Sequence, residues 1–263
     1  MATKCGASES CSLIVDVILR SSDGEQFGAH SKNLEMYSDA FPAAGSTIPP
    51  DGDIVELTEN AQIIQLMLCF THNMPPPDLS SLDMPTLFAL GEPVNLKYGM
   101  RYASECVSKE INKRVATYAN PLEILAYKTK VADVSLIDEV ARRTMSISVE
   151  DVVPVLVNLE TFRTWIRYRE KWQLMLVQYR QALTQYSQSH RGVSSAIRDD
   201  LPRTSDLIGL PSMTTVLSAM AVHTQVNTYS PITLVPAEIG ARESAADRVF
   251  GVVDQFPLWK DFL

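Results

Sequence analysis

The first part of the chain alternates between hydrophobic and polar positions. One face carries Leu13, Val15, Val17 and Leu19, and the other carries Asp16, Ile18 and Arg20. A period of two is typical of a half-buried strand. A Ser-Asp-Gly turn follows at residues 22–24, where Asp bonds to its own backbone and Gly tolerates positive φ. The pattern therefore predicts a strand, a tight turn, a second strand and a short amphipathic helix ending near Phe41.

Further along, the pattern becomes largely helical. Residues 54–57 predict a third strand, and residues 60–70 predict a helix with Ile63, Leu66, Met67 and Phe70 on one face. A helix pair is expected over residues 120–127 and 136–144, with a proline at a first-turn position. The longest helical pattern lies within residues 151–188, and two shorter ones lie near 211–222 and 236–253.

These elements predict an α+β fold class and three segments. Residues 1–11 are small and polar, and we expect a disordered N-terminal tail. Residues 12–116 form the module with the three strands. Residues 117–263 form an all-helical C-terminal extension, in which the aromatic side chains need burial because they carry a large apolar surface. These are Trp165, Trp172, Phe250, Phe256 and Trp259.

The module resembles the BTB/POZ domain. The residues that carry the resemblance are Asp16-Val17, Ser22-Asp23-Gly24, Phe27, Ala29-His30, Leu34, Ser38, Phe41 and the Asn95–Met100 corner. The helix pair is similar to the helices that follow this domain in fungal BTB proteins, and distantly to BACK-type extensions. The resemblance covers residues 13–150. It implies a BTB/POZ fold, a small three-stranded sheet with a cluster of helices, and a BACK-like extension.

The resemblance implies protein–protein recognition. The leading hypothesis is an adaptor or scaffold, including a substrate adaptor for a cullin-type ubiquitin ligase. In such adaptors the ligase contacts the flank of the third strand and the helices that correspond to residues 70–90. Here a triple proline and residues 78–82 replace the short hydrophobic-x-acidic element that these adaptors carry. The alternatives are a self-associating scaffold, such as a transcriptional corepressor, and an enzyme with an unrecognised site.

Five residues are candidates for contacts with a partner. Asp16 resembles the acid of the family's charged pocket, which faces a basic residue directly after the histidine. In this chain Ser31 follows His30, and Lys32 comes one position later. His30 either lines a polar groove or closes the second strand through local hydrogen bonds. Phe70 and His72 lie at the start of the segment that couples the family's adaptors to a ligase.

The sequence predicts no metal and no cofactor. Cys69-x-x-His72 with His30 suggests a metal, but zinc needs three or four convergent ligands, and no second pair has the usual spacing. Cys5 and Cys11 fall in the expected tail, and Cys69 and Cys106 lie among apolar helical neighbours, where thiols are commonly buried. Motifs of phosphate-binding loops, hydrolases and metalloproteases are absent, so we expect no catalytic residues, no enzymatic activity and no small-molecule substrate.

Charge and composition limit the class of partner. The net charge of −8 argues against binding to nucleic acid or to an anionic membrane surface. No apolar run reaches transmembrane length, and the first residues lack a signal peptide's apolar stretch. Four irregularly spaced cysteines indicate a reducing compartment. We expect an intracellular protein of the cytoplasm or nucleus.

The expected oligomeric state is a monomer or a weak dimer. Many relatives in the resembled family dimerise by exchanging a strand and helix that precede the first strand. The residues before Asp16 are few and polar, and cannot supply the roughly 800 Å² per partner of a standard interface. We therefore expect no strand-exchanged dimer.

Overall fold

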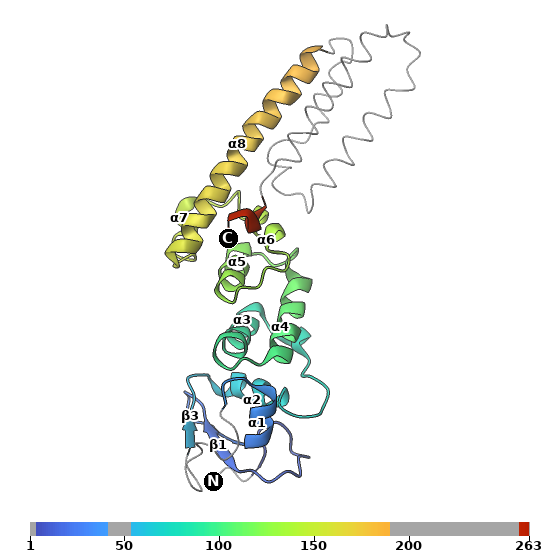
Figure 1. Cartoon of the computed structure of the whole chain (residues 1–263), viewed down its shortest axis with the longest axis vertical. Helices are drawn as coiled ribbons and strands as arrows, with labels where there is room; N and C mark the ends of the chain where they lie inside the picture. The colour runs from blue at the N-terminus through green and yellow to red at the C-terminus, as the bar shows by residue number, and fades with distance from the viewer. Residues whose placement is uncertain (1–3, 42–53, 190–257, 263) are drawn as a thin grey trace, which may run out of the picture. The chain divides into compact units, whose positions relative to one another are not determined.

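The computed structural model describes residues 4–41, 54–189 and 258–262 (Figure 1). Within these ranges the chain is α+β, with one three-stranded sheet and a larger number of helices. The predictions made for the loop at 42–53, the helical stretches near 211–222 and 236–253, and the side chains of Phe250 and Phe256 lie outside the described residues.

The sheet has the order β2-β1-β3. Strands β1 (Val17–Arg20) and β2 (Gln26–Ala29) pair antiparallel, and Gly24 in the turn between them has a φ of +92°. Strand β3 (Ile54–Glu56) pairs parallel to β1, after helix α1 (Ser31–Tyr37). The predicted hairpin and third strand are confirmed. However, β1 begins only at Val17, and Leu13 is 54% exposed, so the alternating pattern extends further than the strand.

Helices complete the first part of the chain. They are α2 (Ala61–Cys69), the short turn η1 (Leu79–Ser81), α3 (Met84–Glu92), the π-helical turn η2 (Pro93–Lys97) and α4 (Arg101–Arg114). Their starts follow ordinary capping chemistry: the Asn60 side chain accepts a hydrogen bond from the Ile63 amide, and Asp83 accepts one from Thr86. The helix predicted over residues 60–70 is confirmed.

The core of this part lies between the sheet and helices α2, α3 and α4. Leu87, Leu90, Val94 and Val107 are fully buried there. Among the apolar residues of the predicted hairpin and helices, Val17, Leu19 and Leu34 are buried, whereas Phe27, Phe41 and Leu66 are only half-buried. Phe27 lies in β2 and Leu66 in α2, whereas Phe41 lies beyond α1, which ends at Tyr37. Position in an element alone does not determine how much of a side chain its neighbours cover.

Residues 4–11 differ from the disordered tail that the sequence predicts. The Gly6 amide donates a hydrogen bond to the Gly28 carbonyl over 2.8 Å, and Cys5 forms a bridge with Gly28 in β2. The two glycines permit this approach, because a Cβ at Gly28 would meet the Lys4 carbonyl oxygen and a Cβ at Gly6 would meet Leu68 and Phe27. The segment is therefore attached to the edge of the sheet.

The chain divides into two compact units. The first contains the described residues up to Arg114 together with Lys130–Asp133, and the second contains Val115–Thr129 and the described residues from Val134 onwards. The second unit is helical. Its elements are α5 (Pro121–Lys130), which ends in the first unit, α6 (Ile137–Arg143), α7 (Val149–Val152), α8 (Leu159–Ser189) and the short turn η4 (Trp259–Phe262).

Aromatic side chains form the core of the second unit, as expected. Trp165 and Trp259 are fully buried and Trp172 is 2% exposed. Tyr168 on α8 lies edge-on to Trp259, with 5.4 Å between ring centroids, and the Trp259 amide donates a hydrogen bond to Asp138 on α6. Among the described residues, no helix combines the length and the apolar character needed to cross a bilayer.

Candidate functional site

Two cysteines and two histidines converge in the first unit. The donor atoms of Cys5, Cys11, His30 and His72 all lie within 4.8 Å of one another. Cys5 Sγ is 3.2 Å from His72 Nε2, and Cys11 Sγ is 3.3 Å from His30 Nε2. We call these four residues the Cys/His cluster. It is the group of side chains in the described part of the chain whose atoms are placed to hold a metal ion.

Three separate elements position the Cys/His cluster. Cys5 is held by its bridge to Gly28 in β2. His30 follows that strand directly and is the N-cap residue of α1. His72 lies just after the C-terminal end of α2. The cluster therefore joins the N-terminal segment, the strand-to-helix junction and the end of α2.

Both imidazole rings are oriented by hydrogen bonds at Nδ1. His30 Nδ1 is 2.8 Å from the Ile14 carbonyl oxygen, and His72 Nδ1 is 3.0 Å from the Leu68 carbonyl oxygen. A carbonyl can only accept, so each Nδ1 carries the proton and donates it. In the neutral ring the lone pair is then on Nε2, which in both residues faces a thiol. The two rings are edge-on, with centroids 5.2 Å apart.

The thiols sit in a partly enclosed environment. Cys5 is 9% exposed, and burial raises the pKa of its thiol, although hydrogen bonds from the backbone at Ala7 and Ser8 oppose that shift. Cys69 lies nearby, with its Sγ 3.8 Å from the Ala7 carbonyl oxygen, but it is not one of the four converging residues. Cys69 and Cys106 are both half-buried, so they are less enclosed than the sequence suggests.

The charged pair suggested by the family resemblance is not formed. Asp16 instead accepts two hydrogen bonds from Ser31, one from its amide over 2.7 Å and one from its hydroxyl over 2.6 Å. Lys32 is exposed on α1, and no ion pair joins it to Asp16 within the described residues. The one-residue offset is the physical reason, because the residue at the helix start, which faces Asp16, is a serine.

The sequence candidates separate into two groups. The structure brings His30 and His72 together, in the Cys/His cluster, although 42 positions separate them in the chain. Phe70 does not offer a surface contact: it is 3% exposed and lies edge-on to Tyr102, with ring centroids 6.1 Å apart. Sequence reasoning missed Cys5 and Cys11 because it placed them in a disordered tail. Considering all four cysteines together with all four histidines would have kept them as candidates.

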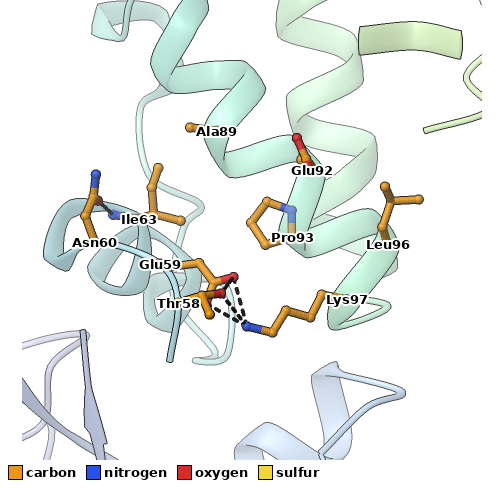
Figure 2. Close-up of a pocket in the computed structure, with 9 residues that line it drawn as sticks. All are labelled: Thr58, Glu59, Asn60, Ile63, Ala89, Glu92, Pro93, Leu96 and Lys97. Carbon is orange, nitrogen blue, oxygen red and sulfur yellow. Dashed lines mark hydrogen bonds and ion pairs between the residues drawn. The ribbon is translucent and has the colours of Figure 1, made fainter. Parts of the chain in front are cut away.

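A shallow groove lies between the start of α2 and the α3–η2 segment (Figure 2). It has a volume of about 540 Å³. The Lys97 ammonium reaches from η2 across the groove to Thr58 and Glu59, as the dashed lines in Figure 2 show. On the same side as Lys97, Leu96 is 53% exposed, and Glu92 pairs with Lys130. The charged groups that line the groove therefore all have partners, and the groove offers no concentrated charge to a ligand.

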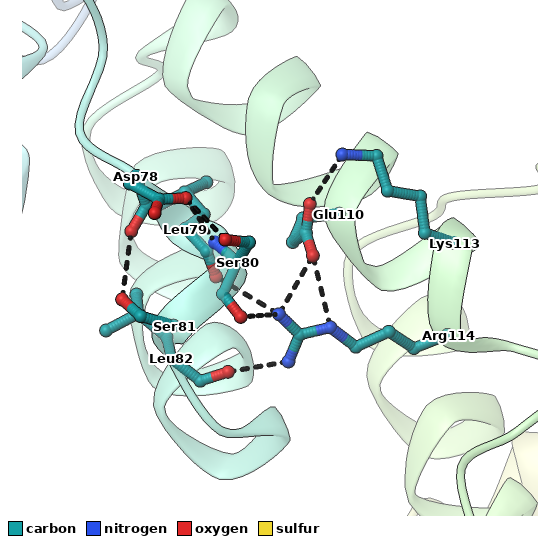
Figure 3. Close-up of polar contacts among 8 residues, drawn as sticks. All are labelled: Asp78, Leu79, Ser80, Ser81, Leu82, Glu110, Lys113 and Arg114. Carbon is teal, nitrogen blue, oxygen red and sulfur yellow. Dashed lines mark hydrogen bonds and ion pairs between the residues drawn. The ribbon is translucent and has the colours of Figure 1, made fainter.

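Arg114 fixes the η1 segment from the side of α4 (Figure 3). Its guanidinium donates to the carbonyl oxygens of Leu82 over 2.6 Å, Ser80 over 2.9 Å and Leu79 over 3.2 Å. It also donates to Glu110, which accepts a further hydrogen bond from Lys113. The Leu79 carbonyl also accepts a hydrogen bond from the Leu82 amide within the turn, and the planar cation with several donors binds all three carbonyls together.

The proline-rich segment that joins α2 to η1 is held at both ends. His72 is fixed in the Cys/His cluster at its start, and Arg114 fixes residues 79–82 at its end. Between these points Met74, Pro75 and Pro76 are exposed, with Met74 41% exposed. We call residues 73–78 the proline connector.

No protein-family model, curated protein or solved structure matches the chain. A functional proposal therefore depends on the contacts described above.

Proposed function

We propose that the protein is a BTB/POZ-type interaction module with a helical extension, and that it acts as an adaptor or scaffold that binds other proteins rather than as an enzyme. One observation carries the proposal. Motif residues that suggest the family, and that are far apart in the chain, contact one another. The α+β architecture with its three-stranded sheet is compatible with that family.

The contact in question joins the end of α1 to the corner before α4. The Ser38 hydroxyl donates a hydrogen bond to the Tyr98 carbonyl oxygen over 2.5 Å, and the Asp39 amide donates to the same oxygen over 3.1 Å. The rings of Phe41 and Tyr98 stack with centroids 5.4 Å apart. Gly99 has a φ of +61°, which turns the chain tightly at this corner. Contacts among these motif residues support the resemblance as the basis of the proposal.

The proline connector is the surface that we propose for the partner. It falls in the region where the resembled family contacts a cullin-type ligase, and it exposes Met74 beside prolines. A segment held at both ends loses little conformational freedom on binding, which favours affinity. Proline-rich segments are also recognised in the extended form that they adopt without a partner. The connector departs from the hydrophobic-x-acidic element of the family's ligase adaptors, so a cullin-type scaffold is the first partner to test and not the only protein that this surface could bind.

Affinity purification of the full chain from a native lysate, followed by mass spectrometry, tests this function. We expect recurrent recovery of ligase subunits with the wild-type chain and at least a tenfold reduction with Met74→Asp. The matched control is Met36→Asp, because Met36 is also an exposed methionine of the same unit, 74% exposed on α1. If both variants reduce recovery equally, the proline connector is not the binding surface. If no specific protein is recovered with the wild-type chain, the adaptor function is contradicted.

Light scattering of the purified chain examines the alternative, a self-associating scaffold. We expect the mass of a monomer at micromolar concentration. A stable dimer that recovers no ligase subunit would favour the self-associating scaffold over the adaptor.

A further inference from the structure

We infer that Cys5, Cys11, His30 and His72 form a structural zinc site that attaches the N-terminal segment to the sheet and to the end of α2. The ligand set is two thiols and two imidazoles, which is a common set for structural zinc. All four ligands come from the protein, so the coordination sphere is closed, as in structural rather than catalytic sites. The inference does not depend on the proposed adaptor function.

The distances agree with tetrahedral coordination. Zinc bonds of about 2.3 Å to sulfur and about 2.0 Å to nitrogen, at the tetrahedral angle, separate a sulfur from a nitrogen by about 3.5 Å. The two Sγ–Nε2 distances in the cluster are 3.2 and 3.3 Å. All pairs of ligand atoms are within 4.8 Å, so an ion at the centre requires the widest pair to close by about 1 Å.

The hydrogen bonds around the cluster are a second, independent observation. Histidines that bind zinc typically donate their other ring N–H to a carbonyl or carboxylate, which fixes the ring and its tautomer. His30 does so to Ile14 and His72 to Leu68. Both rings therefore present an unprotonated Nε2 to the cluster.

Charge and burial favour a cluster that binds zinc over the same four side chains without a metal ion. Coordination would release the two thiol protons to solvent, and two thiolates then neutralise the charge of Zn²⁺. A neutral unit suits a site in which His30 is 5% and Cys5 9% exposed. The mixed sulfur and imidazole ligands disfavour magnesium and calcium, which take oxygen ligands, and iron–sulfur clusters, which mostly take four cysteines.

The test measures bound metal in the full chain. The protein is purified with a reducing agent, without a chelator and without a polyhistidine tag. We expect about one zinc per chain by mass spectrometry of the metal, with X-ray absorption giving two sulfur and two nitrogen ligands. Cobalt substitution should give the visible absorption of a tetrahedral site and a thiolate-to-cobalt band in the near ultraviolet.

Matched variants identify the ligands. We expect Cys11→Ser and His72→Gln to lose nearly all of the bound zinc and the cobalt spectrum. Cys106→Ser is the control, because Cys106 is a half-buried thiol of the same unit, on α4, and is outside the cluster. It should retain the metal. Should a ligand variant fail to fold, chelation of the wild-type chain is the second measurement: it should lower the melting temperature and make the chain around residues 4–11 sensitive to protease.

Three results would overturn the inference. One is reduced, folded wild-type protein that neither contains zinc nor takes up cobalt. Another is zinc that remains in both ligand variants. The third is a Cys5–Cys11 disulfide in the purified chain whose reduction does not lead to metal uptake.

Discussion

Tyr98 donates a hydrogen bond to Glu59 over 2.7 Å, joining the corner before α4 to the residue that precedes the N-cap of α2. The Lys97 ammonium lies 3.0 Å from the same carboxylate oxygen. Burial raises the pKa of Glu59, but the hydrogen bonds from Tyr98 and Lys97 outweigh it, and the pKa is lowered from its ordinary value. Burial, together with the neighbouring carboxylate, raises the pKa of Tyr98. At neutral pH the Glu59 carboxyl is therefore ionised and the Tyr98 phenol is neutral.

The first prediction concerns Glu59→Gln. A carboxyl whose pKa is lower in the folded than in the unfolded chain stabilises the fold above its unfolded pKa, and this contribution is lost as the pH falls through the folded pKa. We expect Glu59→Gln to cost about 1 kcal/mol at pH 7, allowing for partial solvent screening, and to flatten the loss of stability below about pH 4.5. Urea titrations between neutral and acid pH measure this. Glu25→Gln, at an exposed carboxylate, is the control, and an equal effect of both variants would contradict the prediction.

The second prediction separates Arg114 from its neighbour Lys113. Arg114→Ala removes hydrogen bonds to three backbone carbonyls and to Glu110, and should cost about 2 kcal/mol. Lys113 also pairs with Glu110, but its side chain is 70% exposed, so Lys113→Ala should cost less than about 0.5 kcal/mol. Hydrogen exchange should accelerate in the peptide covering residues 78–83 only for Arg114→Ala. No local change in exchange would show that η1 is fixed by other contacts.

The third prediction compares two apolar side chains. Phe41 is half-buried and stacks on Tyr98, so Phe41→Ala should cost about 1–2 kcal/mol rather than the value for a core ring. Leu87 is fully buried, and Leu87→Ala should cost about 3 kcal/mol because it leaves a cavity. Denaturant unfolding of both variants gives the order of the two costs. If Phe41→Ala lowers the free energy of unfolding more than Leu87→Ala does, the half-buried position of the Phe41 ring is contradicted.

The fourth prediction concerns a buried hydrogen bond in the second unit. Trp165 Nε1 donates to the Thr144 hydroxyl over 2.8 Å, and both side chains are fully buried. Thr144→Val keeps the shape but leaves the indole N–H without this acceptor, and should cost about 1–3 kcal/mol. Thr129→Val removes a hydroxyl that bonds only to helix carbonyls, and should cost less than about 1 kcal/mol. Unfolding followed by tryptophan emission compares them, and equal costs would argue against the Trp165 bond as the cause.

Local patterns in the sequence determined the elements. The alternation before residue 20 and the Ser-Asp-Gly turn specify the β1–β2 hairpin, because period and turn chemistry act over a few residues. Asn60 specifies the start of α2 for the same reason, by capping the amide of Ile63. The three tryptophans of the second unit were expected to be buried and are, because surfaces so large and apolar need a core. Phe70 was correctly placed on the apolar face of α2, but its selection as a candidate partner contact was wrong, because the side chain is buried.

The tertiary structure alone decided the Cys/His cluster. Cys5 and His72 are 67 positions apart, and the spacing of the four residues follows no familiar metal motif. Their meeting depends on Gly6 and Gly28, which let the N-terminal segment approach β2, and on the end of α2, which places His72 beside it. Likewise, Asp16 bonds to Ser31 and not to a basic residue, as the family resemblance implied, because a serine begins α1. Local patterns specify which elements form, whereas long-range packing decides which side chains meet, since each meeting depends on several elements at once.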